Sequence, residues 1–356
     1  MTPAAPKVGI ASLREHPDRI DVRSPAEFAI DHIPGAINLP VLDNRERAEV
    51  GTIHAQDSGF AAKRYGAAIV ARNIARILET HCRDKPREWA PLVYCWRGGK
   101  RSGSLAHVLK EIGWRAVQLD GGYQTYRRHV VASLESLPSR FSFAVVCGLT
   151  GSGKSRLLRA LDREGAQVLD LERLANHRGS LLGDHPVDPQ PSQKAFDSGV
   201  VAALAAFDPS RPVFVESESR KIGTVQLGDA LLFAMRAAAC VRLRTPQSLR
   251  VQMLKQDYAH FLGDPAALCD RLSRLVELHG RKVIDRWCSA ARAGDFDTLV
   301  DELLVRHYDP TYARSIEVNF PRSAQAIDVE LPSASDAGMR ALAREVIAAV
   351  SDKEHA

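Results

Sequence analysis

The chain has 356 residues, enough for two or three domains of ordinary size. Hydrophobic residues make up 45% and charged residues 26%, a balance that excludes a disordered, collagen-like or disulfide-stapled protein. The net charge is only +5, but its distribution is uneven. Residues 1–135 carry +5, residues 236–292 carry +6 (eleven Lys and Arg against five Asp and Glu), and residues 293–356 carry −6. A local basic segment can bind a polyanion when the total charge is weak.

Apolar runs in the sequence are short. The N-terminal residues have no run long enough for a secretory signal, and no run approaches the roughly 18 residues needed to span a bilayer. The six cysteines are scattered without a CxxC pair, so we expect free thiols and no zinc site. The sequence therefore predicts a cytoplasmic protein with no membrane association.

Residues 1–135 alternate short apolar runs with helical patterns. Strands are predicted at 19–23, 92–94 and 116–119, helices at 25–31 (with Ser24 as N-cap), 61–81 and 102–112, and a turn at 121–122. This alternation predicts an α/β domain with a parallel sheet.

The pattern is interrupted near residues 133–142, which predicts a second domain over residues 136–356. Strands are predicted at 143–147, 168–169, 213–215 and 240–243, with a glycine loop at 148–153 and a helix at 154–163. A helical, partly basic extension is expected over about 246–307. Residues 314–331 look irregular, and a final helix is predicted at 335–350 within an acidic tail. The second domain is thus predicted as α/β with a helical C-terminal extension.

A cysteine loop follows the strand predicted at 92–94. In the run CWRGGKRSGS (95–104), backbone N–H groups and the start of the next helix favour an anion, and nearby cations favour the thiolate form of Cys95. Cys95 is therefore the candidate nucleophile. The predicted anion loop beside it comprises Arg97, Gly98, Gly99, Lys100, Arg101 and Ser102.

This loop resembles the active-site loop of a rhodanese domain, as do the upstream runs DVRSPAEF (21–28) and HIPGAINLP (32–40). The resemblance implies a cysteine that carries a persulfide-type chalcogen. Five residues separate Cys95 from Arg101, where many sulfur-transfer rhodaneses have four, so a wider, phosphate-bearing donor fits. A phosphatase and a degenerate domain with a structural thiol remain open. For Asp21 and Arg23 we expect support of the loop rather than direct catalysis.

A phosphate-binding loop is predicted at GLTGSGKS (148–155), which matches GxxxxGK[ST] between an apolar strand and a helix. Backbone amides of such a loop hold a diphosphate, the lysine neutralises it, and Ser155 is a potential Mg²⁺ ligand; no other metal is predicted. The predicted diphosphate-binding residues are Gly148, Thr150, Gly151, Ser152, Gly153, Lys154 and Ser155.

Polar runs follow the other strands of this domain, where ligands bind in open α/β sheets. Asp170 and Glu216 end predicted strands and are candidate Mg²⁺ ligands. Arg178, in HRGS (177–180), and Arg220, in VESESRKIG (215–223), are candidate phosphate ligands, with a solvated loop as the alternative.

The order of these motifs resembles the tRNA 2-selenouridine synthases. The resemblance implies a transferase acting on 2-thiouridine at the wobble position of the tRNA anticodon. It implies S-geranylation by geranyl diphosphate, then replacement by selenium from selenophosphate through an intermediate bound to Cys95. Both compounds are co-substrates, so no tightly bound cofactor is expected. A selenophosphate synthetase is an expected partner.

Ligands are also predicted for the phosphate loop, for the basic block and for an apolar run. The phosphate loop is assigned to geranyl diphosphate from charge and shape, and the basic block 236–292 to RNA, with Tyr258, Phe261 and Trp287 as stacking faces. Leu231, Leu232 and Phe233 are offered as a slot for the geranyl chain, although each is explained more simply as buried core. The alternatives are an ATP-dependent kinase or hydrolase with a sulfur-transfer domain, and a binding protein built from two decayed enzyme folds.

Overall fold

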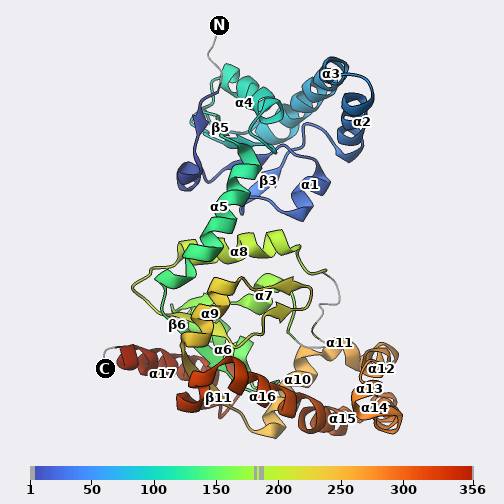
Figure 1. The fold of residues 1–356 in the computed structure, drawn as a ribbon, viewed down its shortest axis with the longest axis vertical. Coiled ribbons are helices and arrows are strands. Elements are labelled where there is room, and N and C mark those ends of the chain that lie inside the picture. The colour runs from blue at the N-terminus through green and yellow to red at the C-terminus, as the bar shows by residue number, and fades with distance from the viewer. Residues whose placement is uncertain (1–4, 180–182, 184–187, 355–356) are drawn as a thin grey trace. The chain divides into compact units, whose positions relative to one another are not determined.

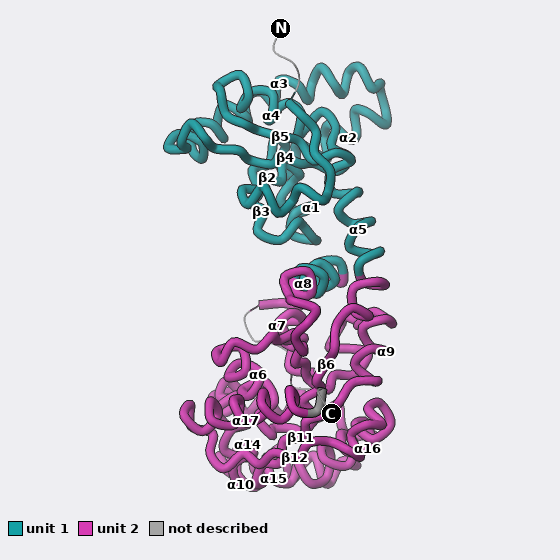
Figure 2. The backbone as a smooth tube through the Cα atoms, turned by 90° about the vertical axis from the view of Figure 1, so that its left-hand side faces the viewer, with its two compact units in different colours: residues 1–133, 194–202 teal, residues 134–193, 203–356 magenta. Residues whose placement is uncertain are grey.

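The computed structural model describes residues 5–179, 183 and 188–354 (Figure 1). Contacts divide the chain into a first unit, residues 1–133 with 194–202, and a second unit, residues 134–193 with 203–356 (Figure 2). The assignment of residues 194–202 corrects the predicted division at 135/136. These residues belong to helix α8 (Gln193–Ala206), and two of their side chains bind residues of the first unit. Asp197 pairs with Arg127 at 2.5 Å, and Ser198 donates a hydrogen bond to Asp31 at 3.1 Å.

The first unit contains a five-stranded sheet whose strand pairs are all parallel, in the order β1-β5-β4-β2-β3. Its strands are β1 (Lys7–Val8), β2 (Arg19–Asp21), β3 (Ala36–Asn38), β4 (Leu92–Tyr94) and β5 (Val117–Leu119). Its helices are α1 (Pro25–Ile30), α2 (Asn44–Gln56), α3 (Gly59–Ile77), α4 (Lys100–Ile112) and α5 (Gly122–Ser136, whose last turn belongs to the second unit), with a short 3-10 turn at Ile10–Glu15 and a π-helical turn at Leu78–Cys82. A 3-10 turn at Pro138–Arg140 follows in the second unit.

Local signals explain most of these boundaries. Ser24 caps α1 in a capping box with Glu27, as its sequence predicts. The strand predicted at 19–23 ends at Asp21, because the backbone N–H of Arg23 bonds the Asp21 side chain instead of continuing the ladder. Helix α2 was not predicted, since its apolar face is weak; a second capping box, between Asp43 and Glu46, starts it.

The second unit contains a second parallel sheet, ordered β12-β11-β6-β8-β7, with a separate hairpin of β9 and β10. Its strands are β6 (Phe143–Cys147), β7 (Gln167–Leu169), β8 (Val213–Glu216), β9 (Lys221–Ile222), β10 (Val225–Gln226), β11 (Ala239–Arg244) and β12 (Ile327–Glu330). Its first helices are α6 (Lys154–Arg163), α7 (Leu171–Ala175) and α9 (Asp229–Ala237).

A helical region follows β11, as predicted after Pro246. It contains α10 (Gln247–Asp257), α11 (Ala259–Leu262), α12 (Pro265–Ser273), α13 (Val276–His279), α14 (Arg281–Ala293), α15 (Phe296–Leu303), a π-helical turn at Leu304–Tyr308 and α16 (Asp309–Asn319). The prediction that 314–331 is irregular was wrong. Helix α16 has no buried residue and so gives no apolar stripe, while β12 is a four-residue strand ordered by parallel pairing with β11.

The final helix, α17 (Asp336–Glu354), packs on α6. Both helices share one apolar core with the sheet, and Val146, Leu157 and Val346 are members with no exposed side chain. This packing fixes α6, whose first turn carries the phosphate loop. Within the described part of the chain, no helix combines the length and apolar character needed to cross a membrane.

Candidate functional site

Cys95 lies directly after β4 and is almost fully buried. The Ser102 hydroxyl, in the first turn of α4, donates to the Cys95 sulfur at 3.2 Å, and Ser102 itself accepts from the Gln118 amide at 2.7 Å. The same amide group donates to the carbonyl oxygens of Gly98 and Gly99 at 2.6 and 2.9 Å. Gln118, which the sequence did not point to, therefore holds the middle of the cysteine loop and its helical end.

Two glycines let the cysteine loop approach the β5–α5 turn. Gly98 and Gly122 both have positive φ, at 60° and 58°. A Cβ on Gly98 would lie 2.4 Å from the Leu119 carbonyl oxygen, and one on Gly122 would lie 2.3 Å from the Cys95 carbonyl oxygen. Only glycine fits such a contact between two backbones.

The three cations predicted around Cys95 differ in their surroundings. Arg97 and Lys100 are exposed, whereas Arg101 donates to the Glu27 carboxylate at 2.9 Å. Burial raises the pKa of Glu27, but the hydrogen bond and charge of Arg101 outweigh burial and lower it overall. Arg101 is therefore paired with Glu27, while the effect of the three cations on Cys95 stays a prediction.

Asp21 and Arg23 form a buried ion pair at 2.6 Å. Arg23 also donates to the Asp31 carbonyl oxygen at 2.7 Å, and its guanidinium lies 4.0 Å from the centre of the Tyr123 ring. With their side chains 0% and 1% exposed, these groups connect β2 to α1 and α5. Their geometry is that of a structural pair.

The phosphate loop joins β6 to α6. The Lys154 ammonium donates to the Gly148 carbonyl oxygen at 3.0 Å, and the Ser152 N–H donates to the Leu149 carbonyl oxygen at 3.1 Å. Gly151 and Gly153 have φ values of 73° and 94°, which an L side chain rarely adopts. The loop thus curls around the lysine as a phosphate-binding loop does.

Two hydroxyl groups of this loop face the interior. Thr150 Oγ1 and Ser152 Oγ are buried and make no hydrogen bond within the described part of the chain. Buried hydroxyls are normally paired, and an oxyanion bound by the loop would supply acceptors. The loop therefore fits a phosphate group in chemistry as well as in sequence.

A cleft lies between the phosphate loop, α7 and the end of α10, and acidic side chains lie on its α7 side. The Ser155 hydroxyl donates to Glu172 at 2.6 Å, and the Glu172 N–H donates to Glu216 at 2.6 Å. Asp170, predicted as a metal ligand, lines the same cleft and also caps α7 by accepting from the Arg173 N–H at 2.8 Å. The structure thus puts Glu172, two residues further on, beside Ser155.

Burial controls the protonation of this cluster. Burial above all, and then neighbouring carboxylates, raises the pKa values of Glu172 and Glu216, and burial together with the Glu172 charge raises the pKa of Glu218 to about 8. Glu218 was missed, although the run VESES is unusually polar for a strand exit. Among the described residues, no group of three or more His, Cys, Asp or Glu side chains is arranged to hold a metal ion.

Arg178 and Arg220, the other predicted phosphate ligands, have different positions. Arg178 lines the cleft, donates to the Asp257 carbonyl oxygen and lies over the Tyr258 ring at 4.9 Å. Arg220 pairs with Asp229 at 2.5 Å and is not among the described residues that line the cleft. Ser180, in the same predicted run as Arg178, lies outside the described residues.

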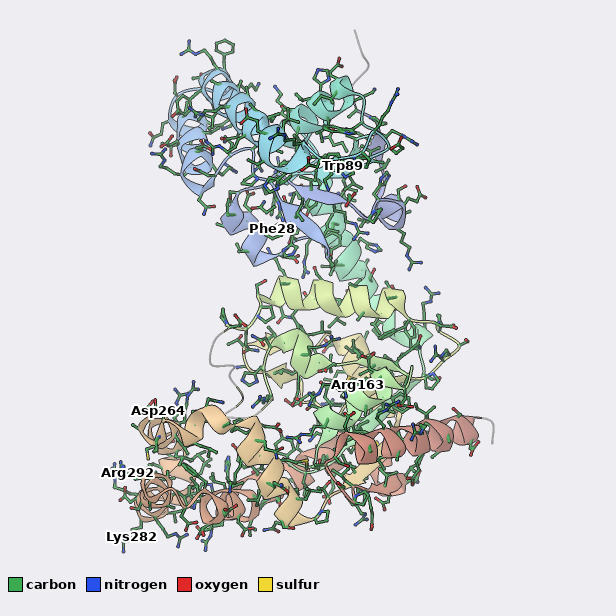
Figure 3. All side chains as sticks on the ribbon, turned by 180° about the vertical axis from the view of Figure 1, so that it is seen from behind. Phe28, Trp89, Arg163, Asp264, Lys282 and Arg292 are labelled. Atoms are coloured by element: carbon green, nitrogen blue, oxygen red, sulfur yellow. The ribbon has the colours of Figure 1, made fainter. Side chains whose placement is uncertain are left out.

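The predicted RNA surface is partly wrong. Trp287 and Phe261 are buried in the core of the helical region, so neither offers a stacking face to a base. The Trp287 indole N–H also donates to Glu302 at 2.9 Å. Tyr258 is half-buried at the cleft. Leu231 and Leu232 are likewise buried core. Exposed cations remain on α14 and beside α12, and Figure 3 shows Lys282 and Arg292 pointing outward. They are Arg274, Arg281, Lys282 and Arg292, and also Arg286, which is paired with Glu302.

Comparison with known proteins matches both units. A model of the rhodanese-like domain matches residues 10–129, and a model described as the tRNA 2-selenouridine synthase AAA domain matches residues 141–271. These matches and the two parallel sheets confirm the predicted fold class.

Curated relatives named tRNA 2-selenouridine synthase cover most of the chain. The protein of Shewanella denitrificans is 35% identical over 82% of this chain and 86% of its own length, and that of Aeromonas salmonicida is 33% identical over 82% and 85%. The protein of Nitrosomonas europaea is 29% identical over 86% of this chain and 92% of its own length. On these matches, and with both predicted loops present in the fold, the chain belongs to the tRNA 2-selenouridine synthase family.

Proposed function

We propose that this protein is a transferase that converts 2-thiouridine at the wobble position of tRNA into 2-selenouridine. The observation that carries the proposal is the pairing, in one chain, of a buried thiol loop with an intact phosphate loop. The names of its relatives support tRNA as substrate. The work is divided between the loops: Gly148–Ser155 activates the sulfur for removal, and the Cys95 loop handles selenium.

In the first step the thiocarbonyl sulfur of the nucleoside attacks C1 of geranyl diphosphate. The new bond is S–C1, the C1–O bond breaks, diphosphate leaves, and the nucleobase loses its N3 proton. Lys154 and the loop amides stabilise the negative charge that grows on the departing diphosphate. S-alkylation matters because a thiocarbonyl sulfur is a poor leaving group and a geranylthio group is a better one.

In the second step selenium at the oxidation level of selenide replaces the geranylthio group at C2. The Cys95 thiolate attacks C2, the C2–S bond to the geranylthio group breaks, and geranylthiol leaves, which gives the cysteine-bound intermediate. Selenophosphate, supplied by a selenophosphate synthetase, is the proposed selenium donor: water attacks its phosphorus, the P–Se bond breaks, and phosphate and selenide are released. Selenide then attacks C2, the C2–S bond to Cys95 breaks, and the thiolate is regenerated. Arg97 and Lys100, both exposed, suit an anionic donor arriving from solvent. Ser102 and Gln118 position the thiol through the hydrogen bonds already described.

Mg²⁺ is a fitting co-ligand for the diphosphate, and it would add charge neutralisation when bound. Ser155 and Glu172 would hold it, because their side-chain oxygens already lie 2.6 Å apart beside the loop. We place the reaction in the cytoplasm, where the anticodon loops of its substrates are available.

The test is a reconstitution. The protein is incubated with tRNA containing 2-thiouridine and geranyl diphosphate, then with selenophosphate, and the digested nucleosides are identified by mass spectrometry after each stage. S-geranyl-2-thiouridine should appear first and 2-selenouridine second. Absence of both products together with rapid ATP turnover would overturn the proposal in favour of an ATP-dependent kinase or hydrolase.

A further inference from the structure

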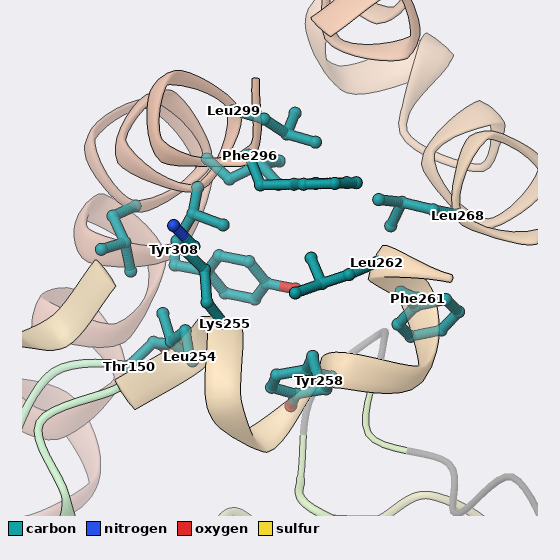
Figure 4. Close-up of a pocket in the computed structure, with 13 residues that line it drawn as sticks. Thr150, Leu254, Lys255, Tyr258, Phe261, Leu262, Leu268, Phe296, Leu299 and Tyr308 are labelled. Carbon is teal, nitrogen blue, oxygen red and sulfur yellow. The ribbon is translucent and has the colours of Figure 1, made fainter. Parts of the chain in front are cut away.

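An apolar pocket lies in the helical region of the second unit. Side chains from α10, α11, α12, α15 and the following π-helical turn line a narrow space of about 60 Å³ that is partly open to solvent. In Figure 4, Leu262, Leu268 and Phe296 point toward one another across this space.

The lining of this pocket is almost entirely hydrocarbon. Leu254, Leu299 and Val300 form part of its wall, and the charged Lys255 at its edge is neutralised by both carboxylate oxygens of Asp297, at 2.8 and 2.9 Å. The pocket therefore suits an uncharged, apolar group and offers little to a polar one.

The apolar pocket adjoins the phosphate-loop cleft. Thr150, Leu254 and Tyr258 line both spaces, and Leu254 packs so closely on the loop that a Cβ on Gly151 would lie 2.7 Å from it. One end of the combined site is thus a cationic loop for phosphate, and the other is a hydrocarbon slot. A ligand that fills both has a diphosphate head and an apolar tail.

We propose that this pocket binds the prenyl chain of the diphosphate donor, with Leu254 and Tyr258 at the junction of head and tail. The inference rests on the proposed function and deepens it, because it assigns the residues that select the donor by chain length. Burial of the chain keeps water from the allylic carbon while its C–O bond breaks. Each methylene buried raises affinity by about fourfold.

The pocket-filling variant Val300→Phe tests this assignment. Val300 is half-buried at the wall, and its matched control is Val305→Phe, because Val305 is 51% exposed on the next helical turn and does not line the pocket. Calorimetry measures binding of geranyl diphosphate, dimethylallyl diphosphate and inorganic diphosphate to each full-length protein. Thermal unfolding checks that each variant folds.

The wild type should prefer geranyl over dimethylallyl diphosphate by at least about tenfold. Val300→Phe should lose this preference and keep its affinity for inorganic diphosphate, whereas Val305→Phe should match the wild type. If Val300→Phe does not fold, Phe296→Ala takes its place; it enlarges the pocket and should shift the preference toward a longer prenyl chain. An unchanged preference for geranyl diphosphate in a folded pocket variant would overturn the inference, and the pocket would then be a gap between packed helices that binds no prenyl chain.

The experiments distinguish a failure of the proposed reaction from a failure of the proposed prenyl site. A wild-type protein that forms no S-geranyl nucleoside, yet shows the pocket-dependent preference for geranyl diphosphate, would overturn the proposed reaction and support the prenyl site. A protein that geranylates tRNA with no effect of Val300→Phe would support the reaction and overturn the site.

Discussion

Cys95 and Lys154 sit in loops with different chemical environments, and each loop is organised by groups outside its motif. Gln118 and Ser102 fix the thiol, while Arg250, 4% exposed on α10, donates to the Thr150 carbonyl oxygen at 2.7 Å and braces the phosphate loop. At the residue scale, a motif supplies the reacting atoms and its packing partners supply their positions.

Replacement of Cys95 by alanine should separate the two steps. Selenium incorporation should fall at least about a hundredfold while S-geranylation persists, because only the second step uses the thiol. Lys154→Ala is the reciprocal variant and should impair geranylation. Mass spectrometry of digested tRNA reports both products. Equal loss of both in Cys95→Ala would refute this division of labour.

Glu218 should make stability depend on pH. Its pKa is raised from 4.5 to about 8, so the folded protein binds a proton that the unfolded chain releases, and stability falls as pH rises across this interval. Glu218→Gln should flatten the fall in thermal unfolding temperature between pH 5 and pH 8, in buffer without divalent cations.

The control for this measurement is Glu164→Gln. Glu164 is a half-buried carboxylate whose pKa is lowered, chiefly by its hydrogen bond with Arg340. Its charge therefore causes no loss of stability between pH 5 and pH 8. A wild-type protein equally stable at both pH values would contradict the protonation assigned to Glu218.

At the scale of elements, each site depends on the contact of a loop with a neighbouring element. The cysteine loop packs backbone to backbone against the β5–α5 turn at Gly98 and Gly122, and the phosphate loop packs against α10 at Gly151. These contacts join segments that are separated in the chain. A loop motif copied without its neighbouring element would lose its shape.

Gly98→Ala should destabilise the first unit by about 3 kcal/mol or more, since its Cβ combines a positive φ with a contact of 2.4 Å to backbone. Gly99→Ala is the matched control, because a Cβ there meets nothing within 4 Å. Urea unfolding of the two variants compares their free energies. Equal free energies of unfolding for Gly98→Ala and Gly99→Ala would show that the β5–α5 turn moves to accommodate the Cβ at position 98.

Arg250→Ala should cost about 3 kcal/mol, because it leaves the Asp309 carboxylate and the Thr150 carbonyl without their buried partner. Affinity for inorganic diphosphate should fall with it. Arg286→Ala removes an exposed arginine paired with Glu302 and should cost under about 1 kcal/mol. Chemical unfolding with calorimetry of diphosphate binding measures both effects; an Arg250→Ala protein with unchanged loop affinity would contradict the bracing role.

At the scale of the whole molecule, part of the basic block pairs with the acidic tail. Over the residues that the structure describes, four of the eleven Lys and Arg residues of 236–292 pair with acids of 293–356 at 3.0 Å or less, and Arg242 lies 3.6 Å from Asp328. The four close pairs are Arg244–Asp328, Arg250–Asp309, Lys255–Asp297 and Arg286–Glu302. Part of the charge predicted for RNA is thus structural, and the exposed set on and near α14 is the part best placed for a polyanion.

Affinity for tRNA should fall steeply with salt, and reversing the exposed set should flatten this dependence. Replacing Arg281, Lys282 and Arg292 by glutamate should reduce the slope of log K against log salt by roughly 0.7–0.9 for each phosphate that the variant no longer neutralises. The control is Arg163→Glu, whose arginine is exposed and paired with Asp336. Filter binding over a salt series measures the slopes; an unchanged slope in the triple variant would place the RNA surface elsewhere.

The amino-acid sequence by itself determined the fold class, strands such as 92–94 and 143–147, helix α6 and both loops. These signals are local: apolar runs, caps and glycine spacings act over a few residues. Only the tertiary structure decided that Arg101 pairs with Glu27, that Glu172 rather than Asp170 meets Ser155, and that Trp287 is core. It also decided that residues 314–331 contain the end of α16 and β12, and that part of the +6 block pairs with the acidic tail. Each depends on pairing between distant segments, which no single stretch of sequence specifies.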